Sequence, residues 1–169
     1  LAWIKRLSKL INDIYDAGRP LLGVCFGHQI IAQALGGDVE KSKKGWGLGL
    51  HTYRIDNKAD YMANLAEKIT LNICHQDQVI RPPQEAVVYA QSDFCKCAGF
   101  FIKDKVLTMQ AHPEFLVDFT KDLLNFRSEG EGGYIPQDVV DKAIYGLEEN
   151  PSRVESKHFA ETIRRFFLN

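Results

Sequence analysis

The chain has 169 residues, of which 45% are hydrophobic and 25% charged, as is ordinary for one globular domain with its own core. Its formal net charge of −1 provides neither the basic footprint of a nucleic-acid-binding protein nor the polybasic segment of a membrane-surface protein. No apolar run reaches the roughly 18 residues that span a bilayer, and the four irregularly spaced cysteines exclude a disulfide framework, so we expect one domain over residues 1–169 in the reducing cytoplasm.

The first part of the chain predicts a helix, a strand and a second helix. Residues 1–17 carry apolar side chains three and four positions apart, which is the pattern of an amphipathic helix. Residues 21–24 form a short apolar strand typical of a buried parallel sheet, and residues 26–35 predict the next helix. Because the chain opens directly on a helix, without an initiator methionine or a leading strand, we expect an N-terminal portion to be missing from it.

The rest of the chain continues the alternation of strands and helices after a glycine-rich loop at residues 41–49. The predicted strands span residues 50–55, 69–73, 86–91, 98–103 and 106–110. The predicted helices span residues 61–67, 115–128, 136–149 and 155–167, with a glycine-rich interruption at 130–133. The last two strands flank Asp104-Lys105 and should form a hairpin. The pattern indicates an α/β fold with an open, mostly parallel sheet flanked by helices.

A sharp turn with a cysteine at its centre joins the first strand to the second helix. In Gly23-Val24-Cys25-Phe26-Gly27, the flanking glycines remove Cβ atoms that would clash when the middle residue adopts a strained conformation. Cys25 then lies at a helix N-terminus, where the dipole and free N–H groups favour a thiolate. Since the thiolate is the form that attacks a carbonyl carbon, we expect Cys25 to be a catalytic nucleophile.

A candidate base and a group to orient it follow the last predicted strand. Pro113 separates His112 from Glu114 and restricts His112 to extended conformations, so both side chains should point to the same side. Open parallel sheets place their active sites at strand ends, where both Cys25 and His112 fall. The three residues therefore match the nucleophile, base and orienting carboxylate of a catalytic triad.

Three motifs, in this order, resemble the class I (triad) glutamine amidotransferase family. They are Gly23-Val24-Cys25-Phe26-Gly27-His28-Gln29, Cys74-His75-Gln76-Asp77-Gln78-Val79 and His112-Pro113-Glu114. The resemblance runs from residue 1 to about residue 120, and the helical tail is similar to stand-alone members related to the amidotransferase domain of GMP synthase. It implies the flavodoxin-like architecture of that family, without its N-terminal strands.

The resemblance also implies a reaction and a role for each matching residue. Cys25 would attack the γ-amide carbon of L-glutamine, with release of ammonia and hydrolysis of a cysteinyl thioester to glutamate, while His112 and Glu114 act as base and orienting carboxylate. The N–H of Phe26 would be one oxyanion-hole donor, and Gln29 would contact the amino-acid end of the substrate. The α-amino and α-carboxylate groups would be bound by the backbone around Cys74, His75, Gln76 and Asp77. The family's second oxyanion donor comes from a glycine loop upstream of the first helix, so we expect it in the missing N-terminal portion.

Two other functions stay open. A γ-glutamyl peptidase would use the same triad on a γ-glutamyl amide with a larger leaving group, and a non-catalytic binding or regulatory domain would keep only the scaffold. The expected partners are L-glutamine or a γ-glutamyl compound and a separate ammonia-accepting synthase subunit. We expect no cofactor and no metal, because Cys95-Lys96-Cys97 lacks the paired ligands of a zinc site. For His28 we predict a packing or capping role, because the start of a helix turns its side chain away from Cys25.

Overall fold

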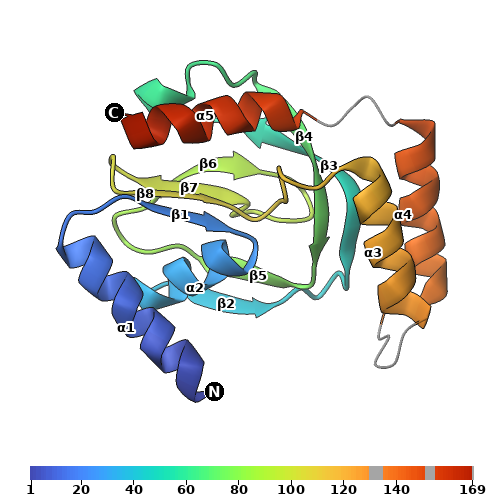
Figure 1. The fold of residues 1–169 in the computed structure, drawn as a ribbon, viewed down its shortest axis with the longest axis horizontal. Helices are drawn as coiled ribbons and strands as arrows, with labels where there is room; N and C mark the ends of the chain where they lie inside the picture. Colours follow the sequence, from blue (N-terminus) through green and yellow to red (C-terminus); the bar gives the residue numbers. More distant parts are fainter. Residues whose placement is uncertain (130–134, 151–154, 169) are drawn as a thin grey trace.

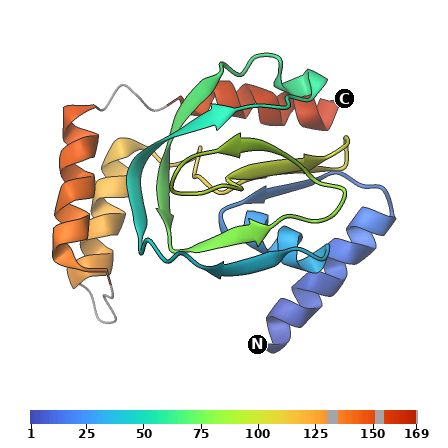
Figure 2. The same cartoon turned by 180° about the vertical axis from the view of Figure 1, so that it is seen from behind.

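The computed structural model describes residues 1–129, 135–150 and 155–168. The elements are α1 (Ala2–Asp16), β1 (Leu21–Val24), α2 (Phe26–Ala34), β2 (Asp38–Lys41), β3 (Gly47–Ile55), the 3-10 turn η1 (Asp60–Met62), β4 (Lys68–His75), β5 (Asp77–Arg81), β6 (Val87–Gln91), β7 (Gly99–Ile102), β8 (Val106–Met109), α3 (Val117–Glu129), α4 (Gln137–Glu149) and α5 (Ser156–Leu168). Figures 1 and 2 show a curled sheet with helices around it. The predicted α/β class is confirmed.

The direction of most strands differs from the prediction of a mostly parallel sheet. The sheet has six strands in the order β1-β8-β7-β6-β3-β4, and β2 pairs with β5 in a separate two-stranded ribbon. In the described residues β1–β8 is the parallel pair, and the other pairs are antiparallel. A parallel pair needs a long crossover connection, whereas β3 to β8 follow one another without an α-helix between them. Short connections therefore favour antiparallel pairing in this half of the chain.

Most of the predicted elements are present within a few residues of their expected bounds, including the β7–β8 hairpin. The predicted helix over residues 61–67 is wrong except at residues 61 and 62, which belong to η1. β3 begins at Gly47, inside the predicted loop. The prediction missed β2 and β5. Three of the four residues of β2 are exposed, so this strand has no apolar pattern to reveal it. The predicted interruption at residues 130–133 lies outside the described residues.

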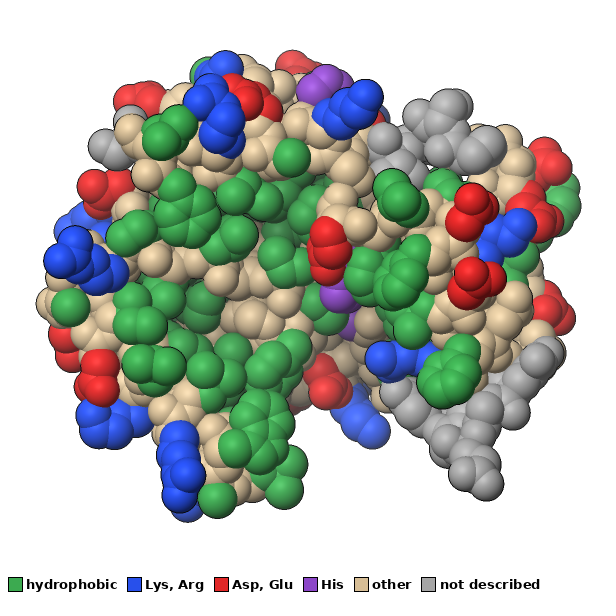
Figure 3. Space-filling model, in the orientation of Figure 1, with side chains coloured by type: hydrophobic (Ala, Val, Ile, Leu, Met, Phe, Trp, Pro, Cys, Tyr) green, Lys and Arg blue, Asp and Glu red, His purple; other side chains and the backbone are tan. Residues whose placement is uncertain are grey.

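Helices pack on both sides of the sheet and at one end of it (Figure 1). α5 contributes Phe159 and Phe166 to the largest core cluster, while α1 and α2 contribute Ile11 and Ile31 to a second one. The α3–α4 pair lies against β3 and β4. Figure 3 shows apolar side chains gathered on the face between α5 and α1. In the described part of the chain, no helix is both long and apolar enough to traverse a membrane.

The turn between β1 and α2 is held by a close approach of two backbone segments. Cys25 has φ 50° and ψ −103°, in the left-handed range of φ that non-glycine residues rarely adopt. A Cβ atom on Gly23 would lie 2.7 Å from the carbonyl carbon and oxygen of Gly27 and 2.7 Å from Ile31 Cδ1, whereas a Cβ atom on Gly27 would meet nothing within 4 Å. The predicted steric reason for glycine therefore holds at Gly23 and not at Gly27.

We predict opposite effects on stability for alanine at these two glycines. Gly23→Ala should lower the free energy of unfolding by about 1–3 kcal/mol, because the new methyl group meets backbone atoms that cannot rotate away. Gly27→Ala should leave it unchanged or raise it by up to about 1 kcal/mol, because alanine favours the helix and the space is open. Urea unfolding of the two variants measures the difference, and equal midpoints would contradict the close packing of β1 on α2.

Candidate active site

The parallel pairing of β1 with β8 brings the cysteine and histidine segments to the same end of the sheet. Val24, the last residue of β1, faces Met109, the last residue of β8. The Cys25 N–H continues this ladder by donating to the Met109 carbonyl at 2.8 Å. Three residues after Met109, the N–H of His112 donates to the Asn72 carbonyl on β4 at 2.8 Å. Cys25 thus follows directly after β1 and His112 lies three residues after β8, and each is anchored by a hydrogen bond of its own backbone N–H.

His112 and Glu114 form an ion-pair geometry, with 2.7 Å between Nδ1 and Oε1. The imidazole ring also stacks on Phe115, with ring centroids 3.9 Å apart and an interplanar angle of 11°. The His112 side chain is 15% exposed and that of Glu114 is 54% exposed. Because a carboxylate only accepts hydrogen bonds, Nδ1 carries the proton, and the Nε2 of a neutral His112 then has a free lone pair. This arrangement suits a general base whose ring is fixed on two sides.

The Cys25 thiol is a weak acid in this structure. Burial raises its pKa to about 11, which outweighs the hydrogen bond from the Phe26 N–H that lowers it. Smaller contributions come from the charges of Cys74 and Glu114, which raise the pKa, and of Arg127, which lowers it. The expected effect of the helix N-terminus is therefore present at Phe26 but is smaller than the effect of burial. A thiol of this kind attacks a carbonyl only if a base removes its proton.

Gln29 uses both amide hydrogens within the protein. Its Nε2 donates to the Asp77 carbonyl at 2.7 Å and to Gln110 Oε1 at 3.1 Å. An amide nitrogen has two hydrogens to donate, so the Gln29 side chain keeps only Oε1 for a ligand. Since that oxygen is an acceptor, it suits an ammonium group and not a carboxylate.

The segment at the end of β4 lies beside the hydrogen bonds of Gln29. Cys74 is buried and lies near enough to Cys25 for their charges to interact, while Asp77 is exposed and offers its carbonyl to Gln29. His75 is also buried, and its Nδ1 lies 3.1 Å from the same Asp77 carbonyl. The carbonyl of Gln76 accepts from the N–H of Ser42 at 2.9 Å instead, which ties Gln76 to the loop after β2. Of the four predicted substrate-binding residues, Gln76 is therefore the one whose backbone bonds to the loop after β2.

Two further histidines of this region, His75 and His28, are buried. Burial lowers the pKa of His75 to about 4 and that of His28 to about 3, so both rings are neutral near pH 7. His28 is fully buried, with Nδ1 2.9 Å from Thr108 Oγ1 and Nε2 3.1 Å from the Cys97 carbonyl. The predicted packing role of His28 is confirmed by these contacts.

Two residues that act on Cys25 were not predicted from the sequence. Gln110 is fully buried, and its Nε2 lies 3.6 Å from Cys25 Sγ. A polar residue directly after the apolar residues of β8 was the available signal. Arg127 on α3 acts on the charge of both Cys25 and Cys74, and nothing distinguishes it in sequence from the other charged residues of that helix.

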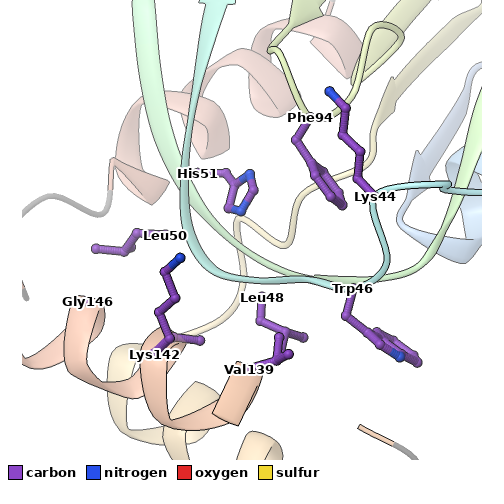
Figure 4. Close-up of a pocket in the computed structure, with 10 residues that line it drawn as sticks. Lys44, Trp46, Leu48, Leu50, His51, Phe94, Val139, Lys142 and Gly146 are labelled. Atoms are coloured by element: carbon purple, nitrogen blue, oxygen red, sulfur yellow. The ribbon is translucent and has the colours of Figure 1, made fainter. Parts of the chain in front are cut away.

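A cavity of about 390 Å³ is lined by residues of β3 and α4, and neither Cys25 nor His112 is among its lining residues. Figure 4 shows Lys142 extending from α4 toward β3, and the wall facing it carries His51 and Phe94. The ring of Phe94 contacts His51 at 5.2 Å and His75 at 5.7 Å between centroids, so the cavity borders the β4 segment through one side chain.

Cys95 and Cys97 are buried free thiols, and the described residues hold no cluster of three His, Cys, Asp or Glu side chains that could bind a metal.

Comparison with known proteins identifies the family of the chain. Gamma-glutamyl peptidase 4 from Arabidopsis thaliana is 33% identical over 171 residues, which cover 98% of this chain and 66% of that protein. The glutamine-hydrolyzing GMP synthase of Crocosphaera subtropica is 37% identical over 103 residues, which cover 60% of this chain and 19% of that protein. The crystal structure of a glutamine amidotransferase from Thermotoga maritima superposes with a TM-score of 0.77 at 20% identity, covering 100% of this chain and 71% of that one.

The chain therefore spans less than two thirds of the length of these curated relatives. Its residues 4–126 match the family "Glutamine amidotransferase class-I". This match extends over more than half of the 169 residues, so the chain belongs to the class I glutamine amidotransferase family.

Proposed function

We propose that this chain carries a cysteine-dependent amide hydrolase that cleaves the γ-amide of L-glutamine to glutamate and ammonia. The observation that carries the proposal is the position of Cys25 beside β8, whose continuation holds the His112–Glu114 pair at 2.7 Å. Family membership supports the same chemistry. The proposal treats residues 1–169 as one domain that acts in the cytoplasm and passes ammonia to a separate synthase subunit or releases it.

The reaction begins with proton transfer from the Cys25 thiol to Nε2 of His112. The thiolate attacks the γ-carbonyl carbon, and the negative charge moves to the carbonyl oxygen of a tetrahedral intermediate, toward which the Phe26 N–H is the candidate donor. When the intermediate collapses, the C–N bond breaks and the leaving nitrogen takes the proton from His112 as ammonia departs. Glu114 keeps Nδ1 protonated and stabilises the imidazolium that forms between these steps.

A water molecule completes the cycle. His112, now neutral, removes a proton from that water, and the resulting hydroxide attacks the thioester carbonyl. The C–S bond breaks, glutamate leaves, and the Cys25 sulfur regains its proton from His112. In the bound substrate, the α-ammonium group suits Gln29 Oε1, the one group of that side chain that is still free to accept a hydrogen bond.

A second candidate function is γ-glutamyl peptide hydrolysis. It is favoured by the similarity to Gamma-glutamyl peptidase 4, which extends over 98% of this chain. The same attack applies, with an amino acid or peptide as the leaving amine in place of ammonia. Ammonium release from glutamine, compared with amine release from γ-glutamyl dipeptides at equal concentration, separates the two functions.

The first prediction concerns the nucleophile. A diazo ketone analogue of glutamine should add to Cys25 of the full-length protein and produce a mass shift on the peptide that contains it. Cys25→Ser should abolish the labelling and lower turnover by at least about 10³-fold, because an unactivated hydroxyl is a far weaker nucleophile. Cys95→Ser serves as the thiol control, because Cys95 is a free cysteine outside the proposed site, and labelling that survives Cys25→Ser would exclude Cys25 as the nucleophile.

The second prediction concerns the base. His112→Ala should lower kcat by about 10²–10⁴-fold while the protein remains folded, because the thiol, with its raised pKa, loses its proton acceptor. Glu114→Gln should also lower kcat, because the amide can donate to Nδ1 and stabilise the wrong tautomer.

His158→Ala provides a matched control, since His158 also lies near a glutamate, Glu155, at 3.8 Å, but on α5. Its turnover should equal that of the wild type. Near-normal turnover by His112→Ala, measured as glutamate formation, would assign the base to another residue.

A further inference from the structure

We propose that Gln110 is a further catalytic residue, whose amide N–H donates to Cys25 Sγ and stabilises the thiolate, and that Gln29 and the Asp77 carbonyl fix its orientation. This inference rests on the proposed function, because it concerns the nucleophile of that reaction. It adds a neutral hydrogen-bond donor to the three residues of the triad.

The contacts form one chain from the first residue of β5 to Cys25. The Asp77 carbonyl accepts from Gln29 Nε2 at 2.7 Å, and the same nitrogen donates to Gln110 Oε1 at 3.1 Å. Gln110 Nε2 then lies 3.6 Å from Cys25 Sγ, within hydrogen-bonding distance of a sulfur acceptor. The Gln110 backbone is held as well, since its N–H donates to the Ala98 carbonyl at 2.7 Å. Gln110 is fully buried, so its position is set by the protein and not by solvent.

The order of donors and acceptors along this chain is determined at its fixed end. The Asp77 carbonyl is a backbone group that only accepts, so the Gln29 atom facing it must be the NH₂ group. Because that NH₂ group also faces Gln110, the Gln110 atom opposite must be the carbonyl oxygen. The remaining end of the Gln110 amide, directed at Cys25 Sγ, is therefore its NH₂ group. The Asp77 carbonyl also lies 3.1 Å from His75 Nδ1, so this carbonyl contacts two side chains, those of Gln29 and His75.

A donor at this position answers an electrostatic need of the site. The Cys25 thiol is partly buried, and the charges of Cys74 on β4 and of Glu114 after β8 disfavour its ionisation. The buried Tyr53 hydroxyl of β3 lies near enough to interact with the charge of Cys25. Arg127 on α3 carries a positive charge that favours the Cys25 thiolate. A hydrogen bond to the charged form lowers a pKa without adding another buried charge. An amide supplies this donor at every pH, whereas the imidazole of His112 changes its charge during the cycle.

The test measures the thiol itself, without substrate. We would follow alkylation of Cys25 by iodoacetamide across neutral to alkaline pH, by mass spectrometry of its peptide, in the full-length protein and in Gln110→Met. The variant should react about tenfold more slowly near neutral pH, with the pH profile shifted by about one unit to higher pH. A residue that only fills space would change activity without moving this profile.

Gln110→Glu is the second variant, because it keeps the shape and the acceptor for Gln29 but directs an ionised oxygen at the sulfur. Its profile should shift further than that of Gln110→Met. The control is Gln91→Met, since Gln91 is a half-buried glutamine on β6 that donates to Asp56 at 2.9 Å, and its profile should match the wild type. If Gln110→Met does not fold, as judged by circular dichroism, the Gln110→Glu profile alone decides.

Wild-type profiles in both Gln110 variants would overturn the inference. This outcome is distinct from failure of the proposed function, because alkylation of Cys25 needs no glutamine. A wild-type protein that hydrolyses neither glutamine nor γ-glutamyl dipeptides would refute the proposed function. The alkylation profiles would still decide whether Gln110 donates a hydrogen bond to Cys25.

Discussion

The parallel alignment of β1 with β8 is the constraint on which the site depends. The two strands are separated by about eighty residues of sequence, yet Val24 and Met109 end them side by side. Everything proposed for the reaction follows from that register, because Cys25 comes directly after one strand and Gln110 directly after the other. A slip of one residue would turn the side chains of a strand to the opposite face and separate the sulfur from its donor.

The turn at Cys25 shows how backbone packing serves chemistry. The left-handed φ of Cys25 is maintained because Gly23 lets β1 approach the first turn of α2 without a Cβ atom between them. Burial of the Cys25 side chain raises its pKa, which disfavours the thiolate that a helix N-terminus would otherwise favour. In the proposed reaction, His112 therefore has to remove the proton from the Cys25 thiol, and the contacts of its ring with Glu114 and Phe115 fix its orientation.

The hydrogen-bonded chain from Asp77 through Gln29 to Gln110 connects the proposed substrate segment with the nucleophile. The three residues come from three parts of the fold: the start of β5, the first turns of α2 and the end of β8. Such a chain restrains the relative positions of these three parts. Gln29 therefore has two roles. Its Nε2 donates hydrogen bonds within the protein, and its Oε1 is left for the substrate contact that the family resemblance implies.

The sequence by itself determined the local features: the β1–turn–α2 unit, the hairpin of β7 and β8, the C-terminal helices and the motifs around Cys25, His112 and Glu114. Periodicity and turn residues encode these features within a few positions, so they can be read without the rest of the chain. Only the tertiary structure decided the strand directions, the burial of the thiol and the contact of Gln110 with Cys25. These depend on pairing and packing between segments far apart in sequence, which no local pattern of residues specifies.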